Sequence, residues 1–95
     1  MRYIVKCGDA KTTYISGGVF VSNGRWTHPK MTLNDYELVV VLKGRFWMKI
    51  GGMKKEFQEG DCFLLFPDEE HYGIEGAWDV SFYWLHFQIQ GEEVI

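Results

Sequence analysis

Apolar residues in this chain occur in short runs that end at glycine turns, and none of the runs repeats at helical spacing. The turns read NG at 23–24, KG at 43–44, GG at 51–52 and EGD at 59–61, with β-branched and aromatic residues between them. The predicted strands are residues 13–16, 18–22, 36–42, 45–50, 54–58, 61–66, 72–74 and 80–90. Short strands at this spacing predict an all-β, antiparallel sandwich or barrel, and 95 residues allow one domain.

The composition excludes several classes of function. Hydrophobic residues make up 46% and aromatic residues 17%, which is enough for a core and argues against disorder. The net charge is -3 and the only adjacent basic pair is Lys54-Lys55, so the basic face of a nucleic-acid-binding domain is missing. No apolar run is long enough to span a bilayer, and the first residues do not read as a signal peptide. We therefore expect a cytoplasmic protein that binds no membrane.

Two features that suggest chemistry have simpler interpretations. The cysteines, Cys7 and Cys62, are far apart in unlike contexts, whereas a metal knuckle or a redox pair needs close spacing. We expect two reduced thiols, with Cys62 in a core strand. The stretch PDEEH at 67–71 carries adjacent carboxylates that point in different directions, so we expect a solvated turn rather than a catalytic pair.

Three predicted strands are apolar on both faces, namely LVVVL at 38–42, CFLLF at 62–66 and VSFYWLHFQI at 80–89. One face of each can line a barrel interior, but the other face must be covered as well. A chain of this length has no helix available for that purpose. The cover is expected from a second sheet, from a partner subunit or from chain outside this sequence, and we predict a homodimer.

Three stretches resemble a cupin, and more narrowly the N-terminal sensor domain of AraC-type transcriptional regulators. They read DYELVVVLKGRFWMKIGG, FQEGDCFLLFPDEEHYG and SFYWLHF. The first cupin motif has a glutamate and a glycine separated by six residues, as Glu37 and Gly44 are. The second has a Gly-Asp turn, an apolar strand, a proline and a histidine, matched by residues 60–71. The closing aromatic strand that ends in His-Phe is typical of the AraC-type sensors.

The resemblance covers roughly residues 26–90 and implies a single small cupin-type β-barrel, that is, a jelly roll or double-stranded β-helix. It implies an effector-sensing and dimerisation domain, residues 1–95, that binds a small molecule inside the barrel. DNA would be contacted only by a C-terminal helix-turn-helix domain that this sequence does not contain. The effector is expected to order the N-terminal segment, roughly 1–17, or a loop at the rim, and so to shift the DNA-binding units.

Resemblance to the sugar-sensing members implies which side chains read the ligand. Phe82, Trp84 and His86 share one face of the last strand and are expected inside the barrel with Tyr72. An aromatic plane stacks on the apolar face of a sugar ring, while His28, Glu37 or His86 would fix its hydroxyls. The predicted ligand-binding residues are His28, Glu37, Tyr72, Phe82, Trp84 and His86. No residue is assigned a catalytic role and no cofactor is expected.

Two other functions stay open at this point. A stand-alone cupin could act as a metal-dependent enzyme on a sugar or a similar metabolite, with His28, Glu37 and His71 as ligands. Metal-binding cupins usually have a His-x-His pair, but here Lys30 replaces the second histidine, and we expect its charge beside the site to repel a divalent ion. We therefore predict no specific metal. The third possibility is a dimerisation module whose barrel is filled by its own side chains.

Overall fold

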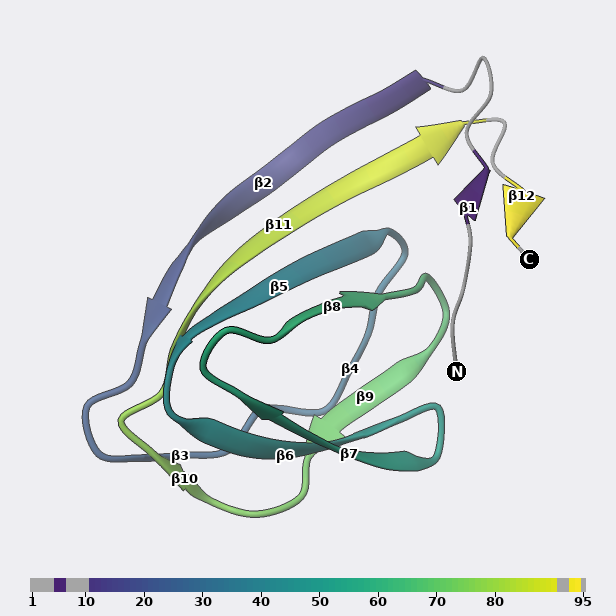
Figure 1. The fold of residues 1–95 in the computed structure, drawn as a ribbon. Helices are drawn as coiled ribbons and strands as arrows, with labels where there is room; N and C mark the ends of the chain where they lie inside the picture. The colour runs from purple at the N-terminus through teal and green to yellow at the C-terminus, as the bar shows by residue number, and fades with distance from the viewer. Residues whose placement is uncertain (1–4, 7–10, 91–92, 95) are drawn as a thin grey trace.

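The computed structural model describes residues 5–6, 11–90 and 93–94, and its longer strands form two four-stranded antiparallel sheets that face each other (Figure 1). The first sheet has the order β2 (Lys11–Val21), β11 (Ser81–Gln90), β5 (Tyr36–Lys43) and β8 (Cys62–Leu65). The second has the order β4 (Met31–Thr32), β9 (Glu70–Gly73), β6 (Arg45–Ile50) and β7 (Met53–Gln58). Two separate two-stranded pairs complete the fold. They are β3 (Arg25–Trp26) with β10 (Ala77–Trp78) and β1 (Val5–Lys6) with β12 (Glu93–Val94).

The all-β, antiparallel fold predicted from the glycine turns is confirmed. The predicted strands 13–16 and 18–22 form one strand, β2, because Gly17 continues the ladder opposite Leu85. The short strands β1, β3, β4, β10 and β12 were not predicted, since two residues cannot display a period. None of the described residues forms a helix long and apolar enough to cross a membrane.

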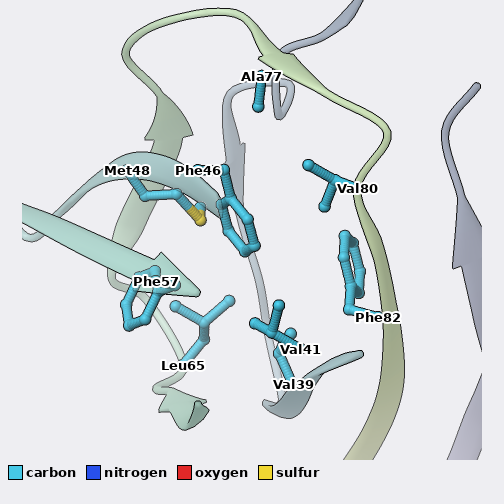
Figure 2. Packing of buried hydrophobic residues seen from close by; sticks show 9 residues of the cluster. All are labelled: Val39, Val41, Phe46, Met48, Phe57, Leu65, Ala77, Val80 and Phe82. Atoms are coloured by element: carbon cyan, nitrogen blue, oxygen red, sulfur yellow. The ribbon is translucent and has the colours of Figure 1, made fainter. Parts of the chain in front are cut away.

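The core lies between the two sheets. Figure 2 shows its side chains pointing toward one another from both sides. They are Val39, Val41, Leu65 and Phe82 of the first sheet, Phe46, Met48 and Phe57 of the second, and Ala77 and Val80. Burying one large apolar side chain completely contributes about 1.5–3 kcal/mol, so this cluster is the main source of stability for the described part of the chain.

The outer face of the first sheet is apolar and only partly covered. Its side chains alternate with those that point into the core, and they include Val19, Val21, Leu38, Val40, Tyr83 and Leu85. Val19 is 53% exposed and Tyr83 is 51% exposed. The second sheet covers the inner face, and the described residues leave this outer face partly open to solvent.

Cys62 is exposed on β8, so the expectation that it lies in the core is wrong. The reason is that β8 is an edge strand, and Cys62 shares the outer face of the first sheet with its neighbour Val40. Cys7 lies outside the described residues.

Candidate ligand-binding site

A cavity of about 340 Å³ opens between the inner faces of the two sheets. It is lined by Phe20, Trp26, His28, Pro29, Met31, Glu37, Phe82, Trp84 and His86. The structure thus brings five of the six predicted binding residues, all except Tyr72, to one cavity. The volume falls at the small end of the range for ligand pockets, on the order of 300–1,000 Å³.

Tyr72 lies apart from this cavity. It sits on β9 next to the fully buried His71 and therefore points to the opposite, outer face of the second sheet. There it pairs across the strands with Lys49, and the Nζ of Lys30 lies 6.0 Å from the centre of its ring. Its parity on a short strand was not visible from the sequence alone.

Strand register explains how β11 supplies three lining residues. Phe82, Trp84 and His86 alternate along the strand, so they share the face that points to the interior. On β5 their direct partners are Val41, Val39 and Glu37, all of which are buried. The cavity is therefore positioned by the two central strands of the first sheet.

Gly18 makes room for the indole ring of Trp84, its direct partner across β2 and β11. A Cβ atom on Gly18 would lie 3.2 Å from Cζ2 of that ring, closer than most Cβ contacts. Sequence reasoning did not single out Gly18, although glycine inside a strand often marks a close approach by another group.

Aromatic side chains form one wall of the cavity. The ring centre of Phe20 lies 4.8 Å from that of Trp26 and 5.0 Å from that of Phe82. The Trp26 ring also contacts the ring of His28 edge-on, with centres 5.5 Å apart. Phe20 and Trp26 were not among the predicted site residues, because β2 was predicted as two separate pieces and β3 has only two residues. Such a wall can stack on a flat apolar ligand surface.

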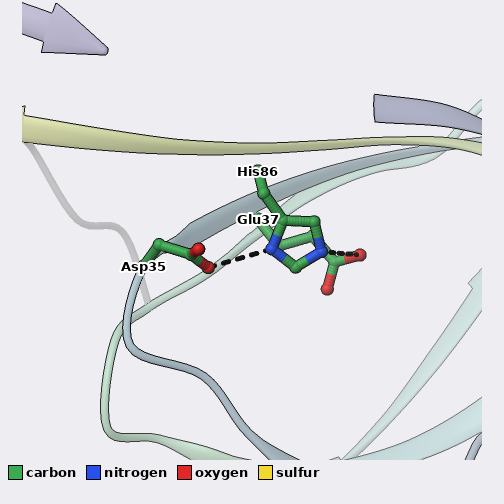
Figure 3. A network of polar contacts seen from close by, with 3 residues as sticks. All are labelled: Asp35, Glu37 and His86. Atoms are coloured by element: carbon green, nitrogen blue, oxygen red, sulfur yellow. Dashed lines mark hydrogen bonds and ion pairs between the residues drawn. The ribbon is translucent and has the colours of Figure 1, made fainter. Parts of the chain in front are cut away.

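The polar side of the cavity is an imidazole between two carboxylates, as Figure 3 shows. The Nδ1 of His86 donates a hydrogen bond of 2.9 Å to Oδ1 of Asp35. Its Nε2 lies 3.5 Å from Oε2 of Glu37. When His86 is protonated, both contacts become ion pairs and the three groups together carry one negative charge. Asp35 was missed from the sequence because it precedes β5 in a turn and shows no period.

Burial shifts the pKa values of the polar lining residues. Burial raises the pKa of Glu37 above its ordinary value of 4.5; the His86 ring opposes this effect, and the Asp35 carboxylate adds to it. Burial lowers the pKa of His28 below 6.5, while its contact with the backbone of Pro29 acts in the opposite direction. The Nδ1 of His28 donates to that carbonyl oxygen at 2.7 Å, which leaves Nε2 as an acceptor in the neutral ring.

His71 lies behind His28, with the ring centres 5.1 Å apart. It is 0% exposed, and neither of its ring nitrogens has a hydrogen-bonding partner among the described residues. Burial lowers the pKa of His71 below 6.5, and the nearby backbone of Glu69 only partly offsets this. A buried imidazole without hydrogen-bonding partners lowers the stability of the folded state, so replacing His71 by an apolar residue is a useful experiment.

The alternative metal set is not gathered into one site. His28 and His71 touch each other, whereas Glu37 faces His86. In the part of the chain that the structure describes, no group of three or more His, Cys, Asp or Glu residues could hold a metal ion. The expectation that Lys30 lies beside such a site is wrong, because its Nζ points outward and lies 3.6 Å from Glu70. The absence of a specific metal stays a prediction, which elemental analysis of protein purified without chelator tests.

Comparison with known proteins also indicates a ligand-binding domain. Residues 17–93 match the model of the AraC-like ligand-binding domain. The chain belongs to this family. The resemblance to cupins and to AraC-type sensor domains is thereby confirmed.

Relatives of this AraC-like domain include regulators and cupins. The chain is 32% identical over 75 residues to the uncharacterised HTH-type transcriptional regulator YisR of Bacillus subtilis (strain 168), which covers 78% of this chain and 26% of YisR. It therefore spans about a quarter of that relative's length.

Solved structures show the cupin fold. The cupin domain of Schizosaccharomyces pombe Cnp3 matches with a TM-score of 0.65 at 12% identity, covering 87% of this chain and 66% of that one. The Cupin_2 domain of an XRE family transcriptional regulator from Enterobacter cloacae matches with a TM-score of 0.59 at 17% identity, covering 81% of this chain and 94% of that one. At these identities the likeness concerns the fold, and the cupin-type barrel predicted from the motifs is confirmed.

Proposed function

We propose that this AraC-like domain senses a saccharide in the cavity formed by β11, β5 and the strands around them. The cavity carries the proposal, because an aromatic wall faces a small set of convergent polar groups. Trp84 and the Phe20–Trp26–Phe82 wall would stack on the apolar face of a sugar ring. Glu37, His86 and His28 would exchange hydrogen bonds with its hydroxyls.

We propose that the protein regulates transcription and that this domain binds its effector without converting it. The family description is that of a ligand-binding domain, and the relative YisR is an HTH-type transcriptional regulator. DNA would be contacted by another part of the protein, and the protein would act in the cytoplasm, where bacterial DNA is. The ligand can change DNA binding only if it prefers one arrangement of the regulator to the other.

The segment proposed to respond to the effector is now partly defined. Residues 11–17 belong to β2 and pair with β11, the strand that supplies Phe82, Trp84 and His86. Residues 5–6 pair with 93–94, and residues 1–4 and 7–10 lie outside the described part of the chain. A ligand that contacts Trp84 on β11 would therefore influence β2, the strand paired with β11.

The saccharide proposal is tested by a thermal-shift screen of the 95-residue chain against a panel of sugars, followed by calorimetry. Stacking is worth on the order of 1 kcal/mol, so Trp84→Phe is expected to weaken binding several-fold. Trp47→Phe, on the outer face of the second sheet, is the matched control and should bind as the wild type does. If no sugar in a broad panel binds, the saccharide is excluded. If a bound sugar is converted to a product, the enzyme alternative replaces sensing.

A further inference from the structure

A second cavity, of about 380 Å³, lies on the side of the barrel where the two sheets end. Its walls come from the β6–β7 hairpin of the second sheet and from β8 and the residues after it in the first. The lining of this cavity shares no residue with the first one. Its apolar lining residues are Ile50, Met53, Phe57, Phe63, Leu64 and Phe66. The two strands that flank it, β7 and β8, are both edge strands.

The cavity has a rigid aromatic base. The rings of Phe57 and Phe63 stack with centres 3.8 Å apart and planes 19° apart. Behind them the ring of Phe46, which is 2% exposed, contacts both. Because this base is anchored in the core, the apolar surface it offers is preformed and does not need to be ordered when a ligand binds.

Two opposite charges also line this cavity. Lys55 stands directly across from the buried Met48, so its side chain starts from the inner face of the second sheet. The carboxylate of Glu69 lies over the hairpin turn, where a Cβ on Gly51 would come within 2.9 Å of its Oε2. Within residues 11–90 no ion pair joins Lys55 or Glu69 to any group, although their sequence neighbours Lys54 and Glu70 are both paired.

We propose that this cavity binds an α-amino acid with an apolar side chain, such as leucine or phenylalanine. The ammonium group of the ligand would meet the Glu69 carboxylate, its carboxylate would meet the Lys55 ammonium, and its side chain would pack on the Phe57–Phe63 base. A simple carboxylic acid would leave Glu69 without a partner beside a second negative charge. A simple amine would do the same to Lys55. Only a zwitterion satisfies both charges, and the site is independent of the proposed sugar cavity.

The proposal is tested with L-phenylalanine and L-leucine, titrated calorimetrically into the 95-residue chain. Lys55→Met and Glu69→Gln remove one charge each and keep the shape, and each is expected to weaken binding about tenfold or more. Lys54→Met, whose side chain pairs with Glu75 instead, is the matched control and should bind as the wild type does. Phenethylamine lacks the carboxylate, so it should bind the wild type weakly, and Lys55→Met should bind it no worse than the wild type because a like charge is removed. N-acetyl-L-phenylalanine lacks the ammonium group, so Glu69→Gln should bind it no worse than the wild type does.

Cys62 gives an independent measure of where the ligand sits, because this exposed residue is one of those that line the same cavity. In a Cys7→Ser background, bound L-phenylalanine should slow the alkylation of Cys62 by iodoacetamide. The protection should be lost in Lys55→Met and kept in Trp84→Phe, a change in the other cavity. Melting temperatures equal to the wild type would show that the variants are folded. The proposal is overturned if neither amino acid binds, or if both charge variants bind them with unchanged affinity and unchanged protection.

Discussion

At the scale of single residues, Glu37 is expected to lower the stability of the fold at neutral pH and to strengthen ligand binding. Glu37 is 6% exposed and its pKa is raised by burial, so the folded state holds its proton more tightly than the unfolded state does. The stability that follows is present below the ordinary value of 4.5 and is lost as the pH rises through the raised pKa. At neutral pH the buried carboxylate is therefore a net burden on folding, as is common for groups kept for function.

Glu37→Gln is accordingly expected to raise the free energy of unfolding at pH 7.5 and to have less effect at pH 4.5. The same change should weaken binding of the ligand in the first cavity, since it removes a charged acceptor. Urea denaturation at the two pH values measures the first effect, and calorimetry measures the second. A variant that is less stable at pH 7.5 would show that the contact with His86 outweighs the cost of burial.

His71 provides the second test at this scale. Because its pKa is lowered, it contributes stability above its ordinary value of 6.5 and loses it as the pH falls below that value. His71→Leu removes both ring nitrogens that lack partners and should be neutral or stabilising by about 1–3 kcal/mol. Between pH 8 and pH 5.5 the free energy of unfolding of the wild type should fall relative to that of the variant, because only the wild type carries the His71 ring. A variant that is markedly weaker at pH 8 would indicate that these nitrogens have a partner after all.

Side-chain parity and the family resemblance together led to the residues of the first cavity, since the resemblance decided which face of the last strand points inward. Alternation on one long strand placed Phe82, Trp84 and His86 together, and the cupin motifs supplied His28 and Glu37. Sequence reasoning could not supply residues whose place depends on pairing in space. Asp35 reaches His86 across 51 positions in the sequence, and Gly18 meets Trp84 only through the β2–β11 register.

At the scale of elements, long strands were predictable and short ones were not. β6 displays its own alternation and β5 its own apolar run, whereas β4 exists only because β9 pairs with it and β3 only because β10 does. The same limit applies to Cys62. Its apolar neighbours predicted a core strand, but only the order of strands in the sheet shows that β8 lies at an edge.

The approach of β9 to the segment before β4 depends on Gly73. Its N–H donates to the carbonyl of His28 at 2.9 Å, and a Cβ there would lie 2.6 Å from the backbone nitrogen of His28. Since backbone cannot move aside easily, Gly73→Ala is expected to cost about 1–3 kcal/mol of stability. Gly18→Ala is the matched comparison, because the atoms nearest to its new methyl group belong to the side chain of Trp84 rather than to backbone.

Thermal or urea denaturation of the two glycine variants separates these cases. Gly73→Ala should lower the free energy of unfolding clearly, while Gly18→Ala should lower it less and should alter the fluorescence of Trp84 and binding in the first cavity. Equal losses in both variants would mean that the backbone around Gly73 accommodates the added methyl group without extra strain.

At the scale of the whole molecule, one aromatic ring connects the two cavities. Phe46 lies 5.8 Å from the ring centre of Trp26 and 6.0 Å from that of Phe82, in the wall of the first cavity. It also lies 5.7 Å from the ring centre of Phe57, in the base of the second. The walls of both cavities therefore pack on one core side chain, and the barrel is a shared support for both proposed sites.

The outer face of the first sheet is an apolar surface that the described residues cover only in part. It exposes large apolar side chains, and two of them, Val19 and Tyr83, are direct partners across β2 and β11. We predict that two copies of the chain associate through this face, because a symmetric pair covers both copies with one contact. A stable interface of this kind would bury on the order of 1,200 Å² or more in total.

The double variant Val19→Thr with Tyr83→Thr places a β-branched residue that suits a strand at both positions and puts polar hydroxyl groups in the apolar face. It is expected to weaken self-association about tenfold or more, because interface energy concentrates in a few central apolar side chains. Ile74→Thr, which changes an exposed apolar residue away from this sheet, should leave association unchanged. Sedimentation equilibrium at micromolar concentrations measures both. A wild-type chain that sediments only as a monomer would contradict the prediction, and the face would then need cover from outside these 95 residues.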